Sequence, residues 1–263
     1  MKSSIILIIF LSFIIKVSLG QNTGSFNLHP LKETGLLVGA GSMLLFGQLK
    51  IRNQTILTQS QINDLNANDI FWIDRFATNR SSLLASNISD LGVGVGLLST
   101  GVLLLQKPTR HNLIKIAIVG FETMLLTTGL TYTTKALAQR IRPYMYNNYN
   151  VFDKGSTDMK QSFFSGHTSV TAAACFFTAY TASTYLNNKN LNKYLWIGAF
   201  TIPAFVGSMR IAAGKHFLTD VLVGYGVGAS LGVLVPKLHT VKPTNKQLSL
   251  SPHLNGFSLN YSF

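Results

Sequence analysis

The chain has little charge, and acidic residues are especially scarce. Charged residues make up 12% of its 263 positions, whereas soluble domains average about 25%. Nine Asp and Glu stand against 22 Lys and Arg, for a net charge of +13. The low charge favours a membrane protein or a very apolar helical bundle. The positive excess suits an anionic partner such as phosphate or acidic lipid, and basic residues scattered among apolar segments argue against nucleic acid.

Cysteine is almost absent too. Cys175 is the single one, which excludes an internal disulfide and any site built from paired cysteines. The sequence also shows no carboxylate cluster of the kind that holds Mg²⁺ or Zn²⁺. We therefore expect no cofactor and a chemistry that needs no metal.

The first 20 residues resemble a secretory signal peptide. Lys2 supplies the positive start, Ile5 to Ile15 the apolar core, and Ser18 to Gly20 a small-residue cleavage pattern. Cleavage would leave Gln21 as the first residue. An uncleaved anchor is the alternative, and both imply export.

Residues 21–89 predict a short helix followed by surface helices. Gly35 to Gly47 is apolar but only 13 residues long, too short to cross a hydrocarbon core of ~30 Å. The polar stretch from Gln48 to Ser89 carries aromatic residues at helix-like intervals, which favours amphipathic helices over the bundle or at a membrane interface. Ordinary packing of surface helices is the alternative.

Residues 90–236 form the predicted core. Apolar helices rich in Gly, Ala, Ser and Thr are expected at residues 91–106, 113–134, 168–186, 194–207 and 217–235. We therefore predict an all-α bundle of about five to six apolar helices embedded in a membrane, with a soluble exported bundle as the alternative.

The basic residues of this core predict its orientation. They gather at Lys107 and Arg110, at Lys189 and Lys193, and after the last helix at Lys237 and Lys242. Basic loops face the cytoplasm, so the loops at residues 143–164 and 210–215 should face the periplasm or exterior. This topology requires that residues 35–47 do not span.

The tail, residues 237–263, changes character. Apolar and polar residues alternate in two runs around Asn255-Gly256, which predicts a small C-terminal β-hairpin.

His216 and Asp220 are the first candidate catalytic pair. They lie four residues apart, so on a helix they share one face, and the carboxylate could fix the tautomer of the imidazole. Arg210 lies six residues earlier and could bind an oxyanion next to the ring. Gly214 relaxes the backbone between them. A satisfied buried ion pair is the alternative.

Two further clusters could bind the same anion. Lys135 and Arg142 lie seven apart on one helix face, where an anion would relieve their repulsion. Ser165, Gly166 and His167 precede an apolar run, and free N–H groups at a helix start bind anions. A basic helix end and a simple N-cap are the respective alternatives.

The order of these clusters resembles the three-part signature of the type 2 phosphatidic acid phosphatase family. That family shares its architecture with bacterial class A acid phosphatases and vanadium haloperoxidases. The resemblance covers about residues 113–235. Two positions depart from it: Phe164 stands where the family usually has proline, and Met209 where it usually has serine, although Ser208 lies one residue earlier.

The resemblance implies a role for each residue. His216 attacks phosphorus to form a phosphohistidine, Asp220 orients it, and His167 protonates the leaving oxygen. Lys135, Arg142, Ser165, Gly166 and Arg210 hold the phosphoryl oxygens. Three cations can stabilise the transferring group without a metal.

The expected function is hydrolysis of a lipid phosphate or pyrophosphate at the outer face of the membrane. Candidate substrates are phosphatidic acid, an isoprenoid pyrophosphate or a phosphorylated glycolipid. The alternatives are a soluble exported acid phosphatase acting on small esters, a vanadate-dependent haloperoxidase, and an inactive membrane scaffold.

Overall fold

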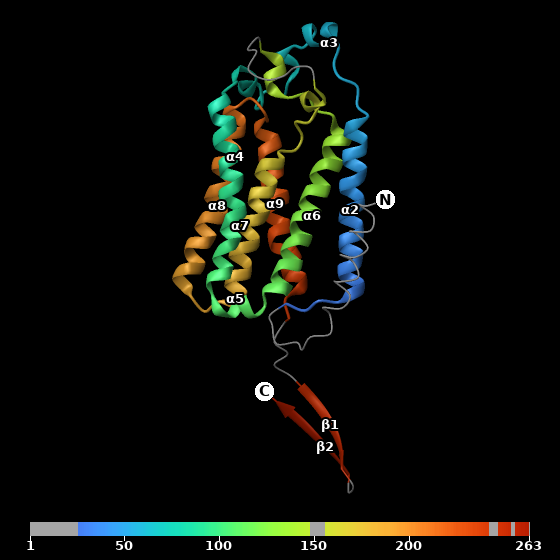
Figure 1. Ribbon diagram of the computed structural model, residues 1–263, viewed down its shortest axis with the longest axis vertical. Coiled ribbons are helices and arrows are strands. Elements are labelled where there is room, and N and C mark those ends of the chain that lie inside the picture. Colours follow the sequence, from blue (N-terminus) through green and yellow to red (C-terminus); the bar gives the residue numbers. More distant parts are fainter. Residues whose placement is uncertain (1–25, 148–155, 242–246, 254–255, 263) are drawn as a thin grey trace, which may run out of the picture.

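The computed structural model describes residues 26–147, 156–241, 247–253 and 256–262, so the signal peptide predicted at residues 1–20 lies outside the described residues. Long helices stand side by side, with the loops gathered at two opposite ends (Figure 1). They are α2 (Pro30–Arg52), α4 (Leu83–Leu98), α6 (Leu113–Ala138), α7 (Gly166–Tyr185), α8 (Lys189–Ala212) and α9 (Leu218–His239).

Short helical turns connect them. The α-helical ones are α3 (Gln59–Asn63) and α5 (Lys107–His111), and the 3₁₀ ones are η1 (Ala67–Asp69), η2 (Arg75–Asn79), η3 (Ser99–Leu105), η4 (Pro143–Tyr146) and η5 (Thr157–Lys160).

The ends of the long helices follow from capping chemistry. The Ser82 hydroxyl accepts from the N–H of Ala85 at the start of α4, and the Asn188 amide oxygen accepts from the N–H of Leu191 at the start of α8. Such caps satisfy N–H groups that have no partner within the helix. Helix α6 ends at Gln139 in the left-handed conformation, with φ of 46°, and Pro143 follows soon after.

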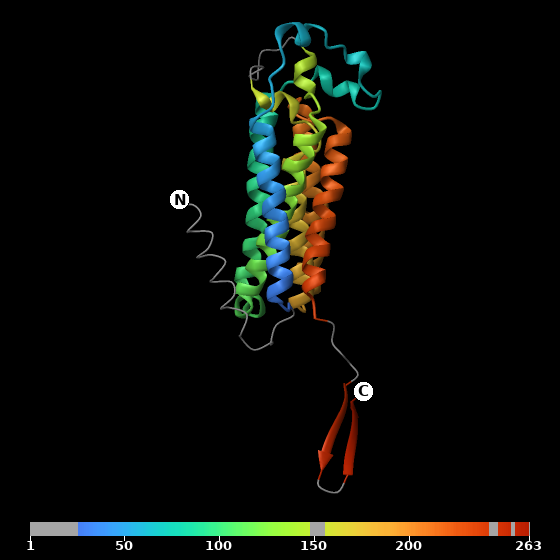
Figure 2. The same ribbon diagram turned by 90° about the vertical axis from the view of Figure 1, so that its right-hand side faces the viewer.

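Helix α7 lies inside the bundle, packed against α4, α6, α8 and α9 (Figures 1 and 2). Its contact with α9 is close because Gly224, Gly228 and Gly232 turn the same face toward it. A Cβ at Gly228 would lie 2.1 Å from the carbonyl oxygen of Ser169 in α7. The prediction that small residues mark close helix contacts is therefore confirmed.

The outer faces of the bundle are apolar. Leu31, Leu84, Leu98 and Leu105 are 91%, 69%, 78% and 74% exposed, as expected where lipid replaces water. Five helical segments are long and apolar enough to cross a membrane. The predicted all-α class and the membrane character are confirmed for the described residues.

Helix α2 corrects one prediction. The apolar segment at residues 35–47 is the middle of a helix of 23 residues that is itself a candidate span. The helix begins with a proline in its first turn and ends with Lys50 and Arg52 in its last turn. Both ends lie outside the apolar run, so a search for apolar runs alone misses them. Its start lies at the α5 end of the bundle (Figure 1). The prediction that this segment is too short to cross a membrane is wrong, because the helix has the length and composition of a span.

The segment between α2 and α4 lies over the other end of the bundle (Figure 1). It holds α3, η1 and η2, where Phe71 and Trp72 are 58% and 69% exposed. Helix α4 begins at Leu83, inside the stretch that the sequence assigned to surface helices.

After α9, strands β1 (Gln247–His253) and β2 (Gly256–Ser262) pair antiparallel, from Gln247 opposite Ser262 to His253 opposite Gly256. The fold is set by the helices, and the C-terminal hairpin is not supported as a part of that fold.

The glycine contact between α7 and α9 can be tested with two matched substitutions. Gly228→Ala forces a methyl group against the α7 backbone, and overpacking of this kind costs about 1–3 kcal/mol. At Gly226 a Cβ would meet nothing within 4 Å, so Gly226→Ala should leave stability unchanged or raise it. Thermal unfolding in detergent measures both, and equal midpoints would contradict the close contact.

Candidate active site

A cavity of about 530 Å³ lies where α6 and α8 end and α7 begins. It brings together residues that are far apart in the sequence. Of the predicted site residues, Lys135, Arg142, Gly166, His167, Arg210 and His216 line it. Both histidines thus face one cavity, as a shared anion requires.

The lining carries an excess of positive charge. Among the described residues, the lining has four cationic side chains, Lys135, Arg142, Arg210 and Lys215, but two carboxylates, Asp90 and Asp158. Lys135, Arg142 and Arg210 are only 8%, 4% and 4% exposed. Buried charges need a counter-charge. With both histidines neutral, the net charge of +2 would balance the charge of −2 on a bound phosphate dianion.

Backbone carbonyls and Asp158 hold the cations in place. Lys135 Nζ donates to the carbonyl of Gln161 at 2.9 Å, and Arg142 donates to the carbonyls of Asp158 and Lys215 at 2.8 and 3.0 Å. Arg142 also meets the Asp158 carboxylate at 2.7 Å. Although burial alone would raise it, the pKa of Asp158 is lowered by Arg142, Lys215 and further cations, so this residue stays ionised.

His216 is buried, with 1% exposure, and only one of its ring nitrogens is engaged. Nδ1 lies 2.7 Å from the carbonyl oxygen of Ser162 and must therefore donate to it. Nε2 has no hydrogen-bond partner among the described residues. Burial first, and then the charges of Arg142, Lys135 and Arg210, lower the pKa of His216 well below 6.5. The ring is thus neutral at pH 7, with a free lone pair on Nε2.

Asp220 is linked to His216 through Ser162 and has no direct hydrogen bond to the imidazole. Its Oδ2 lies 3.6 Å from His216 Nδ1, outside hydrogen-bond distance, but 2.5 Å from the Ser162 hydroxyl. Its Oδ1 lies 2.5 Å from Arg140, which also binds Asp74 at 2.8 Å. The direct contact expected between Asp220 and the imidazole is replaced by a chain from Asp220 through Ser162 to His216.

His167 pairs with a residue that the sequence did not single out. Its Nε2 lies 2.7 Å from Oδ1 of Asp90, in the middle of α4. The same carboxylate oxygen lies 3.7 Å from Arg210. Burial first, and then the charge of Arg210, lower the pKa of His167 to about 4, although Asp90 acts to raise it. The ring is therefore neutral at pH 7 before an anion binds, and a bound anion next to it would favour the imidazolium that an acid requires.

The first turn of α7 presents backbone N–H groups to the cavity, and not the Ser165 hydroxyl. Ser165 is the N-cap: its hydroxyl bonds Thr168 Oγ1 at 2.9 Å, it is fully buried, and it does not line the cavity. Gly166 and His167 line it with N–H groups that have no partner within the helix. The phosphate contact expected from Ser165 stays a prediction.

The departure at Met209 is not compensated by Ser208. The hydroxyl of Ser208 donates to the carbonyl of Phe205 in its own helix and is exposed. Arg210 instead donates to Ser89 Oγ of α4 at 3.2 Å, while its Nε has no partner among the described residues. Gly214 has a φ of +68°, which confirms that the turn between Arg210 and His216 needs glycine.

Asp90, Asp158 and Ser162 are the residues that sequence reasoning missed. Asp90 could have been noticed as a single carboxylate at the border of an apolar segment. Asp158 lies in a polar loop where acids are common. Ser162 orients His216 through its main-chain carbonyl, which no side-chain pattern reveals.

Comparison with known proteins agrees with this site. The model of the PAP2 superfamily matches residues 117–243. A lipid A 4'-phosphatase of Porphyromonas gingivalis is 28% identical over 137 residues, which cover 51% of this chain and 55% of the relative. The chain therefore matches only about half of that protein's length.

A solved structure also resembles the chain. It is a transmembrane PAP2-type phosphatidylglycerolphosphate phosphatase from Bacillus subtilis, with 22% identity, a TM-score of 0.41, and coverage of 76% of this chain and 94% of the other. A likeness this loose carries no argument by itself. The family match is stronger: residues 117–243, which are 127 of the 263 positions, match the PAP2 superfamily and contain Lys135, Arg142, Arg210, both histidines of the cavity and Asp220.

Proposed function

We propose that this protein is a phosphatase that removes one phosphoryl group from a membrane lipid phosphate or lipid pyrophosphate through a phosphohistidine on His216. The observation that carries the proposal is the free Nε2 of a buried, neutral imidazole in a cavity with net positive charge. The family match and the lipid A 4'-phosphatase relative support the same class of reaction.

The reaction needs two transfers of one phosphoryl group. In the first, His216 Nε2 attacks phosphorus, the bond to the leaving oxygen breaks, and the imidazolium of His167 gives that oxygen its proton. In the second, His167 takes a proton from water as the water attacks phosphorus, and inorganic phosphate leaves with His216 restored. Lys135, Arg142 and Arg210 stabilise the oxygens in both steps.

An apolar path next to the site favours a lipid over a small ester. Val93 of α4 and Val170 of α7 are apolar residues that line the site cavity. One helical turn further along the same two helices, Leu97 and Ala174 line a second cavity of about 300 Å³, which α6 completes. A phosphate bound among the cations would thus leave its lipid chain among apolar side chains.

The basic residues support a site on the outer face. Lys107, Arg110 and Lys189 lie at the α5 end of the bundle, opposite the cavity (Figure 1), and basic loops face the cytoplasm. This orientation also places the start of α2 at Pro30 on the cytoplasmic side. Both predictions for residues 1–20, a cleaved signal peptide and an anchor that begins in the cytoplasm, would instead place Pro30 on the outer face and so conflict with this orientation.

The nucleophile is tested by His216→Ala. We expect phosphate release from lipid substrates to fall by several orders of magnitude, because His167, the other histidine among the described residues that line the cavity, is paired with Asp90. Rapid quenching of the wild type with ³²P-labelled substrate should trap an acid-labile phosphoryl group that the variant lacks. His111→Ala, at an exposed position in α5, is the matched control. A variant that keeps its label would exclude His216 as the nucleophile.

The chain from Asp220 to His216 is tested by Ser162→Ala. This change keeps the carbonyl that accepts from His216 but removes the hydroxyl that binds Asp220. We expect kcat to fall about tenfold, equivalent to ~1.4 kcal/mol, with KM nearly unchanged because no substrate contact is lost. Ser208→Ala, whose hydroxyl bonds only within its helix, should be neutral. Equal kcat values for both variants would argue against a functional link from Asp220 through Ser162 to His216.

The apolar path is tested by Ala117→Trp, which fills the second cavity from α6. The KM for long-chain phosphatidic acid or a phosphorylated glycolipid should rise, while hydrolysis of water-soluble p-nitrophenyl phosphate stays unchanged, because only the lipid chain needs that space. Ile114→Trp, at a position 60% exposed that lines neither cavity, is the control. A wild type that prefers the soluble ester would contradict lipid specificity.

A further inference from the structure

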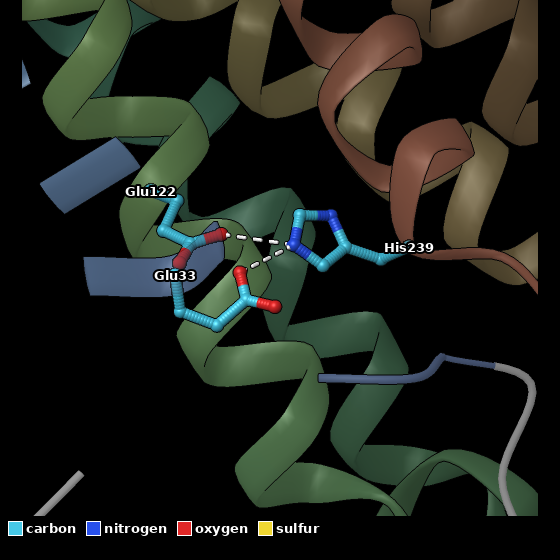
Figure 3. A group of neighbouring side chains, drawn as sticks. All are labelled: Glu33, Glu122 and His239. Carbon is cyan, nitrogen blue, oxygen red and sulfur yellow. Dashed lines mark hydrogen bonds and ion pairs between the residues drawn. The ribbon is translucent and has the colours of Figure 1, made fainter. Parts of the chain in front are cut away.

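A second cluster of titratable groups lies far from the proposed active site. Glu33 near the start of α2, Glu122 inside α6 and His239 at the end of α9 point toward one another (Figure 3). Each is 2% exposed. The three come from helices that enclose one side of the bundle, toward the end opposite the cavity, and the proposed phosphatase chemistry uses none of them.

The imidazole of His239 is oriented toward the carboxylates by its own helix. Its Nδ1 lies 2.8 Å from the carbonyl oxygen of Val235 and must donate to it. Its Nε2 therefore faces the carboxylates, 2.7 Å from Glu33 Oε2 and 3.3 Å from Glu122 Oε2. A backbone carbonyl that fixes the tautomer in this way is the usual outer partner of a metal-binding histidine.

Glu122 is the group that this cluster leaves unsatisfied. Neither of its carboxylate oxygens has a hydrogen-bond partner among the described residues, whereas Glu33 Oε1 accepts from the N–H of His29 at 2.8 Å. One N–H on His239 is already directed at Glu33. Even with the imidazole protonated, two ionised carboxylates would leave a net negative charge in an apolar interior, which is costly.

We propose that Glu33, Glu122 and His239 bind a divalent transition-metal ion, with Zn²⁺ as its representative. One ligand atom from each residue lies within 4.8 Å of the other two, so modest shifts would bring all three to bonding distance of one ion. Two carboxylate oxygens and an imidazole nitrogen suit Zn²⁺ or Mn²⁺. The ion would join α2, α6 and α9 and would be structural, since the residues proposed for phosphoryl transfer lie elsewhere.

The test uses the full-length protein in detergent, purified without a polyhistidine tag. After removal of metal with EDTA and addition of ZnCl₂, mass spectrometry should find about one equivalent of zinc per chain in the wild type. The thermal midpoint should fall by several degrees on EDTA treatment and recover with Zn²⁺. Glu122→Gln should lose both the zinc and the recovery, whereas His111→Ala, at an exposed histidine, should keep them.

A readout on the unmodified chain covers the case in which Glu122→Gln does not fold. Co²⁺ added to metal-free wild type should produce visible absorption bands that Zn²⁺ then removes. Wild type that binds neither ion and shows no change in midpoint would overturn the proposal, and an imidazolium paired with the two carboxylates would remain. The outcome is separate from the proposed function, because His216→Ala should lose activity and retain zinc.

Discussion

The close contact between α7 and α9 is the constraint on which the site depends. Gly224, Gly228 and Gly232 recur every four residues, so they form one stripe along α9, and each would place a Cβ within 2.6, 2.1 and 2.7 Å of a backbone oxygen of α7. At the end of this contact, the N–H of Ser165 donates to the carbonyl of Asp220 at 3.0 Å. The first turns of the two helices are thereby fixed to each other, and with them the positions of His167 and His216.

Within that frame, the structure maintains positive charge in a mostly apolar protein. Carbonyl groups and one carboxylate bind Lys135 and Arg142 without cancelling the excess charge of the cavity. Such fixed groups need little rearrangement when charge develops on a phosphoryl group. The same field disfavours protonation of His216 and so preserves its lone pair. In the proposed reaction, the cations therefore both bind the anion and keep the nucleophile neutral.

Sequence reasoning succeeded for side chains whose chemistry is unusual in their surroundings. Lys135, Arg142, His167, Arg210 and His216 stood out as polar groups in apolar segments, and all of them line the cavity. It failed where apolar length was the criterion: α2 extends into polar sequence at both ends, so its apolar middle was judged too short to span. It also failed for Glu33 and Glu122, which lie 89 positions apart in the sequence and meet only after folding.

The sequence alone determined the helical class, the membrane character and the set of ionisable residues, because hydropathy and residue type are local properties of the chain. The tertiary structure decided which of those residues share a cavity and which nitrogen of His216 is free. It also replaced the expected contact from Asp220 with one from the Ser162 carbonyl. These depend on distances between helices of a few ångströms, which helix packing sets and which no spacing within one helix encodes.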